Sequence, residues 1–317
     1  MAKIGVFDSG YGGLTILDAI RKQIPEYDYL YLGDNARAPY GTHSFDVIYR
    51  YTLEAVNYLI GKNCALIILA CNTASAKALR TIQQRDLPRI NEPYGEADRS
   101  TAGRLEMVND KMVNVLGVIR PTVEAVPGIT KTGHVGILAT PATVSSESYV
   151  LELQKIAEGL QVTQQACPLW VPLIENGEHN GPGAKYFVGK YLRELLVKDS
   201  QIDTLVLGCT HYPLLKEMIE GWLRYHEEIE ESNFPQAIHT EHIRIISQGT
   251  LVAKSLADYL RRHPEYESRL TKATPLSTDS TACGSCRYLT TENADRFSQS
   301  ASQFLSSPIQ AEHINLE

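Results

Sequence analysis

Two short stretches of the chain share one sequence pattern, and this repeat limits the possible folds more than any other feature. The stretch IILACNTAS covers residues 67–75, and LVLGCTHYP covers residues 205–213. In each, an apolar run typical of a buried strand ends at a cysteine, and small or polar residues follow at once. The repeat predicts two similar halves, each with a thiol at the end of a strand.

Apolar runs and helical patterns alternate along both halves of the chain. Apolar runs at residues 3–7 and 65–70 predict strands, and periodic patterns at residues 14–23 and 45–61 predict helices. Such alternation is typical of a parallel sheet with helices on both faces. We therefore expect an α/β fold of two similar parallel-sheet domains. A pseudo-twofold axis would relate them, and the active site would lie in the cleft between them.

A polar stretch marks the expected boundary between the halves. Residues 91–112 are charged and lack a clean period, which predicts a linker or surface insertion. We expect the first domain to comprise residues 1–113 and 248–317, with the Ser/Thr-rich tail of residues 269–317 packing on it. Residues 114–247 would form the second domain.

The overall composition excludes several classes of function. The chain has 317 residues, of which 43% are hydrophobic, and this suffices for buried cores. A net charge of −7 gives no electrostatic footprint for nucleic acid. The start, MAKIGVFDSG, lacks the features of a signal peptide, and no apolar run is long enough to cross a bilayer. We expect a cytoplasmic protein without nucleic-acid or membrane partners.

The six cysteines are expected to be reduced thiols in that compartment. Cys64 and Cys167 lack the polar residues that follow the repeated cysteines, and we interpret them as buried and structural. Cys283 and Cys286 have C-x-x-C spacing, but no second pair or histidine cluster follows at a spacing typical of zinc sites. No metal site is predicted. The tail around this pair is predicted to contain one helix, near residues 293–305.

Cys71 and Cys209, the cysteines of the repeat, are the main candidates for catalysis. In open α/β sheets the ligand crevice lies at the carboxyl ends of the strands. The start of a helix adds unpaired N–H groups and a positive dipole, which would lower a thiol's pKa. The same N–H groups would let Asn72, Thr73 and Thr210 bind a carboxylate. Two thiols on opposite faces of one carbon suit inversion of a stereocentre, because one removes a proton while the other delivers one.

Two further motifs offer substrate-binding residues. FDSGYGGL is glycine-rich after a strand but matches no phosphate-binding loop. Its Asp8 would hold an ammonium group or stabilise a nearby acid, and its Ser9 would bind a carboxylate. The motif APYG would place the Tyr40 hydroxyl and the Gly41 amide in the same crevice. The alternative for both motifs is a tight turn without a ligand.

Two residues of the second half are candidates to assist a thiol. His211 follows Cys209 by two positions and would tune or protonate its thiol. The alternative is a histidine that bonds the backbone at a helix start. Glu175, in VPLIENGE, follows a predicted strand or loop and would be a second carboxylate partner. Its alternative is a solvated loop acid.

Four motifs in this order resemble the glutamate racemases, within the cofactor-independent aspartate/glutamate racemase family: GVFDSGYGGL, YLGDNARAPYG, ACNTAS and LGCTHYPLL. They extend over roughly residues 3–260. The resemblance implies two α/β domains and interconversion of L- and D-glutamate without pyridoxal phosphate or any other cofactor. It also implies a supply of D-glutamate for peptidoglycan, and a homodimer.

The resemblance assigns roles by position. It makes Cys71 and Cys209 the catalytic cysteines, with Cys71 as the base for D-glutamate. It makes Asp8, Glu175 and His211 the groups that assist the thiols. Substrate binding falls to Asp8, Ser9, Tyr40, Gly41, Asn72, Thr73, Thr140, Thr210 and His211. Two alternatives stay open: a racemase for aspartate or another acid, and a non-catalytic relative that binds a partner.

Overall fold

The computed structural model describes residues 2–92, 112–225, 240, 242–273, 283–305 and 307–316. The expected insertion at residues 91–112 therefore lies almost wholly outside the described residues. Within the described part of the chain, no helix has the length and apolar character needed to cross a membrane.

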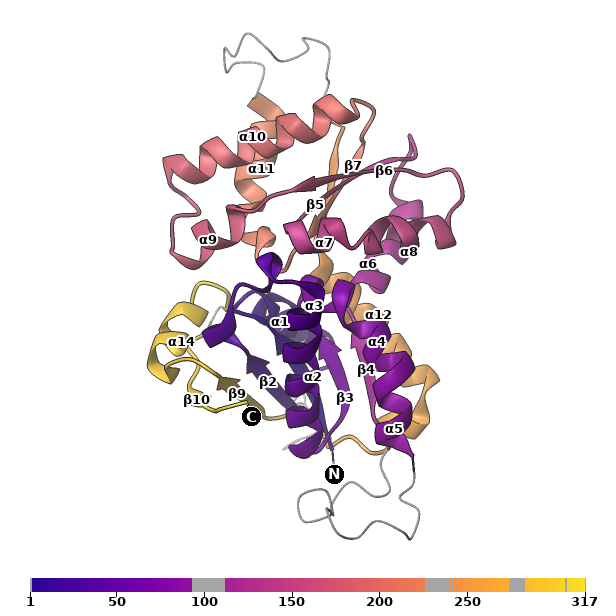
Figure 1. The fold of residues 1–317 in the computed structure, drawn as a ribbon, viewed down its shortest axis with the longest axis vertical. Helices are drawn as coiled ribbons and strands as arrows, with labels where there is room; N and C mark the ends of the chain where they lie inside the picture. The colour runs from indigo at the N-terminus through magenta and orange to yellow at the C-terminus, as the bar shows by residue number, and fades with distance from the viewer. Residues whose placement is uncertain are drawn as a thin grey trace, which may run out of the picture.

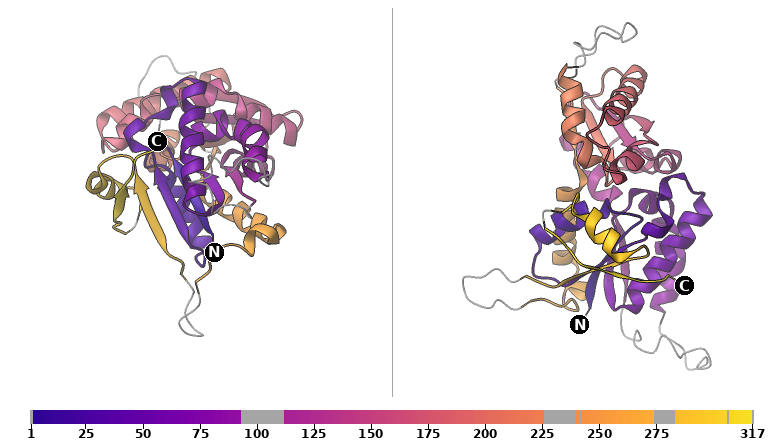
Figure 2. Two further views of the ribbon diagram at one scale, coloured as in Figure 1. Left: turned by 60° about the horizontal axis from the view of Figure 1, so that its bottom comes forward. Right: turned by 90° about the vertical axis from the view of Figure 1, so that its left-hand side faces the viewer.

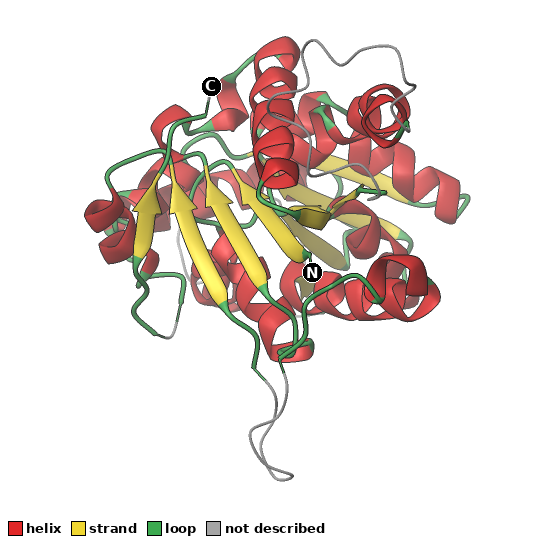
Figure 3. Ribbon diagram, turned by 90° about the horizontal axis from the view of Figure 1, so that it is seen from below, coloured by secondary structure: helices red, strands yellow, loops and turns green. Residues whose placement is uncertain are grey.

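Two parallel sheets form the frame of the molecule (Figure 1), which confirms the predicted α/β class. The larger has the order β10-β9-β2-β1-β3-β4 and the smaller the order β6-β5-β7-β8. Every pairing within them is parallel, and Figure 3 shows neighbouring strands running in one direction. The strands are β1 Lys3–Asp8, β2 Tyr29–Gly33, β3 Cys64–Leu69, β4 Asn114–Gly117, β5 His134–Ala139, β6 Gln161–Ala166, β7 Thr204–Gly208, β8 Arg244–Ile246, β9 Cys286–Thr290 and β10 Ala311–His313.

The smaller sheet repeats the strand order of the inner part of the larger one. In chain order, β5 to β8 pair as β1 to β4 do: second, first, third and fourth. The third strand of each set, β3 or β7, ends one or two residues before Cys71 or Cys209. The sequence repeat is therefore a repeat of topology, and it places the two thiols at equivalent strand ends.

Three features of the sheets differ from the sequence-based expectation. The expected boundary at residue 114 places β4 in the second domain. In the structure β4 pairs with β3 and so belongs to the first sheet. β6 was not expected, because this partly exposed edge strand, QVTQQA, lacks a long apolar run. β9 and β10 were also not expected. They lie in the tail and extend the first sheet beyond β2.

Helices cover both faces of the sheets (Figures 1 and 2). Along the first half they are α1 Gly13–Gln23, η1 Asn35–Arg37, η2 Tyr40–Thr42, α2 Phe45–Gly61, α3 Asn72–Lys77, α4 Leu79–Thr81, η3 Ile82–Asp86, α5 Leu87–Asn91, α6 Ile119–Ala125 and η5 Val126–Gly128. They continue with α7 Pro141–Ser145, α8 Ser148–Ile156, α9 Trp170–Glu175, α10 Pro182–Lys198, η6 Tyr212–Leu215, α11 Lys216–Tyr225, α12 Gln248–Arg262, α13 Pro264–Glu267 and α14 Ala294–Ala301.

The side chains of β1 show why this sheet needs cover on both faces. Ile4 and Val6 join a buried cluster with Leu14 of α1. Phe7 points the other way and joins a cluster with Ile48 of α2. Successive strand residues face opposite sides, so an unbroken apolar run requires an apolar layer on each. This packing fixes the strand end at which Asp8 stands.

Candidate active site

One cavity of about 60 Å³ lies where strand ends of the two sheets meet. It is lined by all twelve residues predicted from the sequence: Asp8, Ser9, Tyr40, Gly41, Cys71, Asn72, Thr73, Thr140, Glu175, Cys209, Thr210 and His211. Its wall also contains residues that we did not single out: Ala38, Pro39, Thr42, Pro141, Pro168, Val171 and Pro172. Four of them belong to APYG or VPLIENGE, so their place in those motifs is a signal that could have found them. The two thiols thus open to one space.

Cys71 is the N-cap residue of α3, and its environment differs from our expectation. Its Sγ lies 3.3 Å from Ser9 Oγ and accepts a hydrogen bond from the Ala74 N–H at 3.4 Å. Burial raises the pKa of the thiol to about 12, and the nearby Asp8 carboxylate adds to the rise. We expected a lowered pKa. Burial outweighs the hydrogen bonds at the helix start.

Asp8 stands beside Cys71 at the end of β1 and is buried. The Gly10 N–H donates to its Oδ2 at 2.9 Å, while its Oδ1 has no hydrogen-bond partner among the described residues. Burial raises the pKa of this carboxyl, and the charge of His211 opposes the rise. A buried carboxylate oxygen on the wall of the cavity is suited to an ammonium group.

Cys209 contacts a histidine, and the other side of that histidine ring contacts a carboxylate. Its Sγ lies 3.8 Å from His211 Nδ1, and His211 Nε2 lies 2.9 Å from Glu175 Oε1. Burial alone would lower the pKa of His211. The hydrogen bonds to Cys209 and Glu175 outweigh it and raise that pKa well above its usual value. Glu175 is the last residue of α9, not a residue after a strand or loop as we expected.

Two glycines let the first half approach the second closely. A Cβ atom at Gly12 would lie 2.4 Å from Thr210 Oγ1 and 2.5 Å from His211 Nδ1. A Cβ atom at Gly41 would lie 2.9 Å from the Cβ of Thr140. Both positions therefore require glycine for the cavity to close as it does.

Hydroxyl groups connect the two halves on the other side of the cavity. Thr140 is the N-cap residue of α7 and accepts from the Thr143 N–H at 3.4 Å. Its Oγ1 lies 2.9 Å from Thr73 Oγ1 and 3.0 Å from Thr143 Oγ1. The starts of α3 and α7 thus face each other across a short hydroxyl chain, close to positions that would hold a carboxylate.

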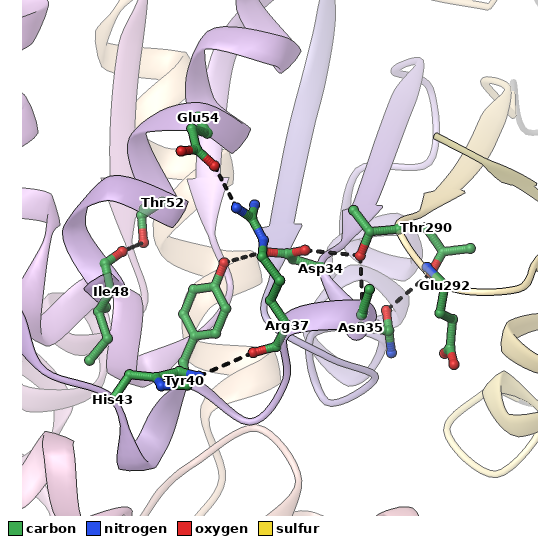
Figure 4. A network of polar contacts seen from close by, with 12 residues as sticks. Asp34, Asn35, Arg37, Tyr40, His43, Ile48, Thr52, Glu54, Thr290 and Glu292 are labelled. Carbon is green, nitrogen blue, oxygen red and sulfur yellow. Dashed lines mark hydrogen bonds and ion pairs between the residues drawn. The ribbon is translucent and has the colours of Figure 1, made fainter. Parts of the chain in front are cut away.

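The Tyr40 hydroxyl is used within the protein rather than offered to the crevice as we expected. It donates to Asp34 Oδ2 at 2.5 Å (Figure 4). Asp34 also accepts from Arg37 Nε at 2.7 Å and from Thr291 Oγ1 at 2.9 Å. This buried network holds Tyr40 in place at the wall of the cavity.

The side-chain amide of Asn72 is likewise occupied. Its Nδ2 donates to Gln248 Oε1 at 2.5 Å, and its Oδ1 accepts from Tyr149 Oη at 2.7 Å and from Gln248 Nε2 at 3.1 Å. All three side chains are buried. What Asn72 can give a ligand is its backbone N–H, which has no partner inside the helix at this position.

The remaining cysteines lie outside the cavity. Cys64 stands at the opposite end of β3 from Cys71, and Cys286 begins β9. The six thiols are free. Across the described residues, no group of three or more His, Cys, Asp or Glu side chains is placed to hold a metal ion.

A thiol at the same topological position in each of two parallel-sheet halves is the arrangement of the aspartate/glutamate racemase class. A scan of protein-family models finds no match to the chain. The glutamate racemase of Ruegeria sp. (strain TM1040) is 38% identical over 312 residues, covering 95% of this chain and 96% of that protein. The chain belongs to the glutamate racemase family.

Solved structures agree with this assignment. The glutamate racemase RacE1 of Bacillus anthracis has a TM-score of 0.77 and 29% identity, covering 99% of this chain and 98% of that one. A glutamate racemase of Francisella tularensis, solved in complex with D-glutamate, has a TM-score of 0.75 and 29% identity. The similarity covers 100% of this chain and 98% of the chain from Francisella tularensis.

Proposed function

We propose that this protein interconverts L- and D-glutamate by moving the α-proton between Cys71 and Cys209 without a cofactor. The observation that carries the proposal is the shared cavity: two thiols at equivalent strand ends line one space. Family membership supports glutamate as the substrate, and the relative from Francisella tularensis is named as a complex with D-glutamate.

Substrate binding would use polar groups that line the cavity. The α-ammonium would bind Asp8 Oδ1, which no described residue pairs, and the carboxylates would bind the N–H groups at the start of α3 and the residues Ser9 and Thr210. An ammonium beside Cys71 would also stabilise the thiolate form. Substrate would thus bring a positive charge next to this thiol and the Asp8 carboxylate.

Proton transfer would run in one direction for each thiol. Cys71, as thiolate, would take the α-proton of D-glutamate while Cys209 delivers a proton to the opposite face; for L-glutamate the roles would reverse. His211, held by Glu175, would supply Cys209 with positive charge or a proton.

The wider setting of the reaction is part of the same proposal. Family membership supports a cytoplasmic enzyme that supplies D-glutamate for peptidoglycan. A homodimer is proposed on the same ground.

The test is incubation of the purified protein with D-glutamate in D2O, with reductant and no added cofactor. We expect loss of optical activity together with deuterium at the α-carbon, and no reaction with Cys71→Ala protein. Absence of both changes with either enantiomer of glutamate would overturn the proposal, and the same assay with aspartate would then test the nearest alternative.

A further inference from the structure

We propose that the C-terminal tail positions His211 for catalysis, through the side chain of Phe304. The proposal rests on the proposed function, because it gives His211 a task on the Cys209 side of the reaction. The tail means here the described residues 283–305 and 307–316. Phe304 is a positioning residue, since it touches His211 and does not line the cavity.

The tail reaches the active site because its first strand ends at the same edge as β1 and β2. β9 pairs in parallel with β2 and ends at Thr290, opposite Gly33. The Thr291 N–H donates to the carbonyl of Gly33 at 3.1 Å, and Thr291 Oγ1 donates to Asp34. α14 then runs beside the sheet (Figures 1 and 2). The tail is thus fixed to the loop that carries Tyr40.

An aromatic group links α14 to the glycine-rich loop after β1. The Tyr11 ring stacks on Phe297 at 5.2 Å and on Phe304 at 5.9 Å between centroids. The Tyr11 hydroxyl donates to Glu292. Tyr11 is 7% exposed and Phe304 is 9% exposed, so the group is nearly closed to water.

Phe304 connects this aromatic group to His211, which lies shortly after β7 of the smaller sheet. Its ring meets the His211 imidazole nearly at right angles, with centroids 5.6 Å apart and planes at 88°. Both nitrogens of His211 are already directed, one to Cys209 and one to Glu175. The backbone of Gly12 approaches the imidazole closely, since a Cβ atom there would lie 2.5 Å from Nδ1, and Phe304 is a second neighbour of the ring. The ring thereby restricts rotation of the imidazole away from Cys209.

Only one of the two thiols depends on this contact. Cys71 is held by Ser9 Oγ and the Ala74 N–H, which lie just after β1 and in α3 rather than in the tail. Loss of the Phe304 ring should therefore affect the Cys209 step and spare the Cys71 step. Such an asymmetry would not follow from a general loss of stability.

The test uses Phe304→Ala, with Phe304→Leu as a variant that keeps apolar volume. Leu305→Ala is the matched control, because Leu305 is the next residue and packs on the same core. A displaced catalytic group commonly costs about 100-fold in rate. We expect kcat of Phe304→Ala to fall about 10- to 100-fold, with KM changed less than about threefold. Leu305→Ala should behave as wild type, and Phe304→Leu should recover most of the loss.

Isotope effects distinguish positioning from instability. Deuterium at the α-carbon of L-glutamate labels the step of Cys209, and deuterium in D-glutamate labels the step of Cys71. In Phe304→Ala the isotope effect on kcat/KM should rise for L-glutamate and fall toward one for D-glutamate, because the Cys209 step becomes more rate-limiting. Isotope effects that stay unchanged, or that change alike for both enantiomers, would overturn the proposal.

Thiol alkylation gives a readout that needs no substrate. With iodoacetamide and peptide mass spectrometry, we expect Cys209 of Phe304→Ala to react about threefold more slowly relative to Cys71, because thiolate is the reactive form. An unchanged or increased ratio would overturn the proposal. If wild-type protein fails to racemise glutamate, the proposed function falls, and this ratio still decides the role of Phe304.

Discussion

The surroundings of Cys71 and Cys209 differ far more than the matching sequence stretches suggest. Cys71 caps a helix beside a hydroxyl and a buried carboxylate, and burial raises its pKa to about 12. Cys209 precedes a turn and has an imidazole 3.8 Å from its sulfur, backed by Glu175. Equivalent positions in the two sheets thus have different electrostatic environments. Cys71 has a carboxylate beside it, whereas Cys209 has an imidazole whose pKa is raised well above its usual value.

The largest expected effect comes from removing either thiol. We predict that Cys71→Ala or Cys209→Ala lowers the rate of racemisation by about 10⁴-fold or more, because each direction needs both a base and an acid. The measurement is circular dichroism with each enantiomer of glutamate. Cys64→Ala, which removes a buried thiol at the far end of β3, should retain activity. Substantial turnover in either of the first two variants would refute the two-thiol mechanism.

A smaller effect is expected from removing the group that distinguishes the two thiols. His211→Asn should lower kcat by about 100-fold, because Cys209 loses its positively charged neighbour while Ser9 and Asp8 stay beside Cys71. Alkylation of Cys209 should slow relative to Cys71 in the same sample. His134→Asn is the control, since His134 pairs with Asp199 outside the cavity. Equal slowing of both thiols would show that the two environments are not independent.

The smallest effect concerns stability at high pH. The pKa of the Cys71 thiol is about 12 in the folded protein, against about 8.5 in an unfolded chain. Between these values the unfolded chain has lost a proton that the native state keeps. The free energy of unfolding therefore falls as pH rises, by about 1.4 kcal/mol per unit for this group. The contribution is fully present below the lower pKa and is lost as pH passes the higher one.

Cys71→Ala should remove that part of the pH dependence. Between pH 9 and pH 11, urea unfolding should show a decline in stability that is smaller by about 2 kcal/mol than in wild type. An unchanged decline would mean that the thiol is not protonated in the folded protein, and the contrast between the two sites would weaken.

Much of the fold and site was predictable because the informative residues are local in sequence. Asp8, Cys71 and Cys209 stand at or within two residues of the ends of apolar strands, and parallel strands bring such positions to one edge. The strand β6, at the edge of its sheet, and the strand β9, between β10 and β2, were not predictable in the same way. They are polar or partly exposed and carry no apolar run, so their pairing depends on contacts distant in sequence.

The roles of individual polar groups were the least predictable. The partners of the Asn72 amide include Gln248, which is distant in the sequence, so no local sequence pattern predicts this contact. The Tyr40 hydroxyl turns toward Asp34 because that buried carboxylate needs donors. The prediction of a lowered pKa for the Cys71 thiol was wrong for a related reason. A helix start can be read from sequence, whereas the depth of burial that outweighs it cannot.

The most direct test of the central claim asks whether the two thiols face opposite sides of one carbon. Single-cysteine variants should still remove the α-proton from one enantiomer, and a chloride at the β-carbon of glutamate reports that step by elimination. We predict that Cys71→Ala eliminates chloride from L-3-chloroglutamate only, and that Cys209→Ala eliminates it from the D-enantiomer only. Elimination from the same enantiomer by both variants, or from both enantiomers by one, would contradict the account.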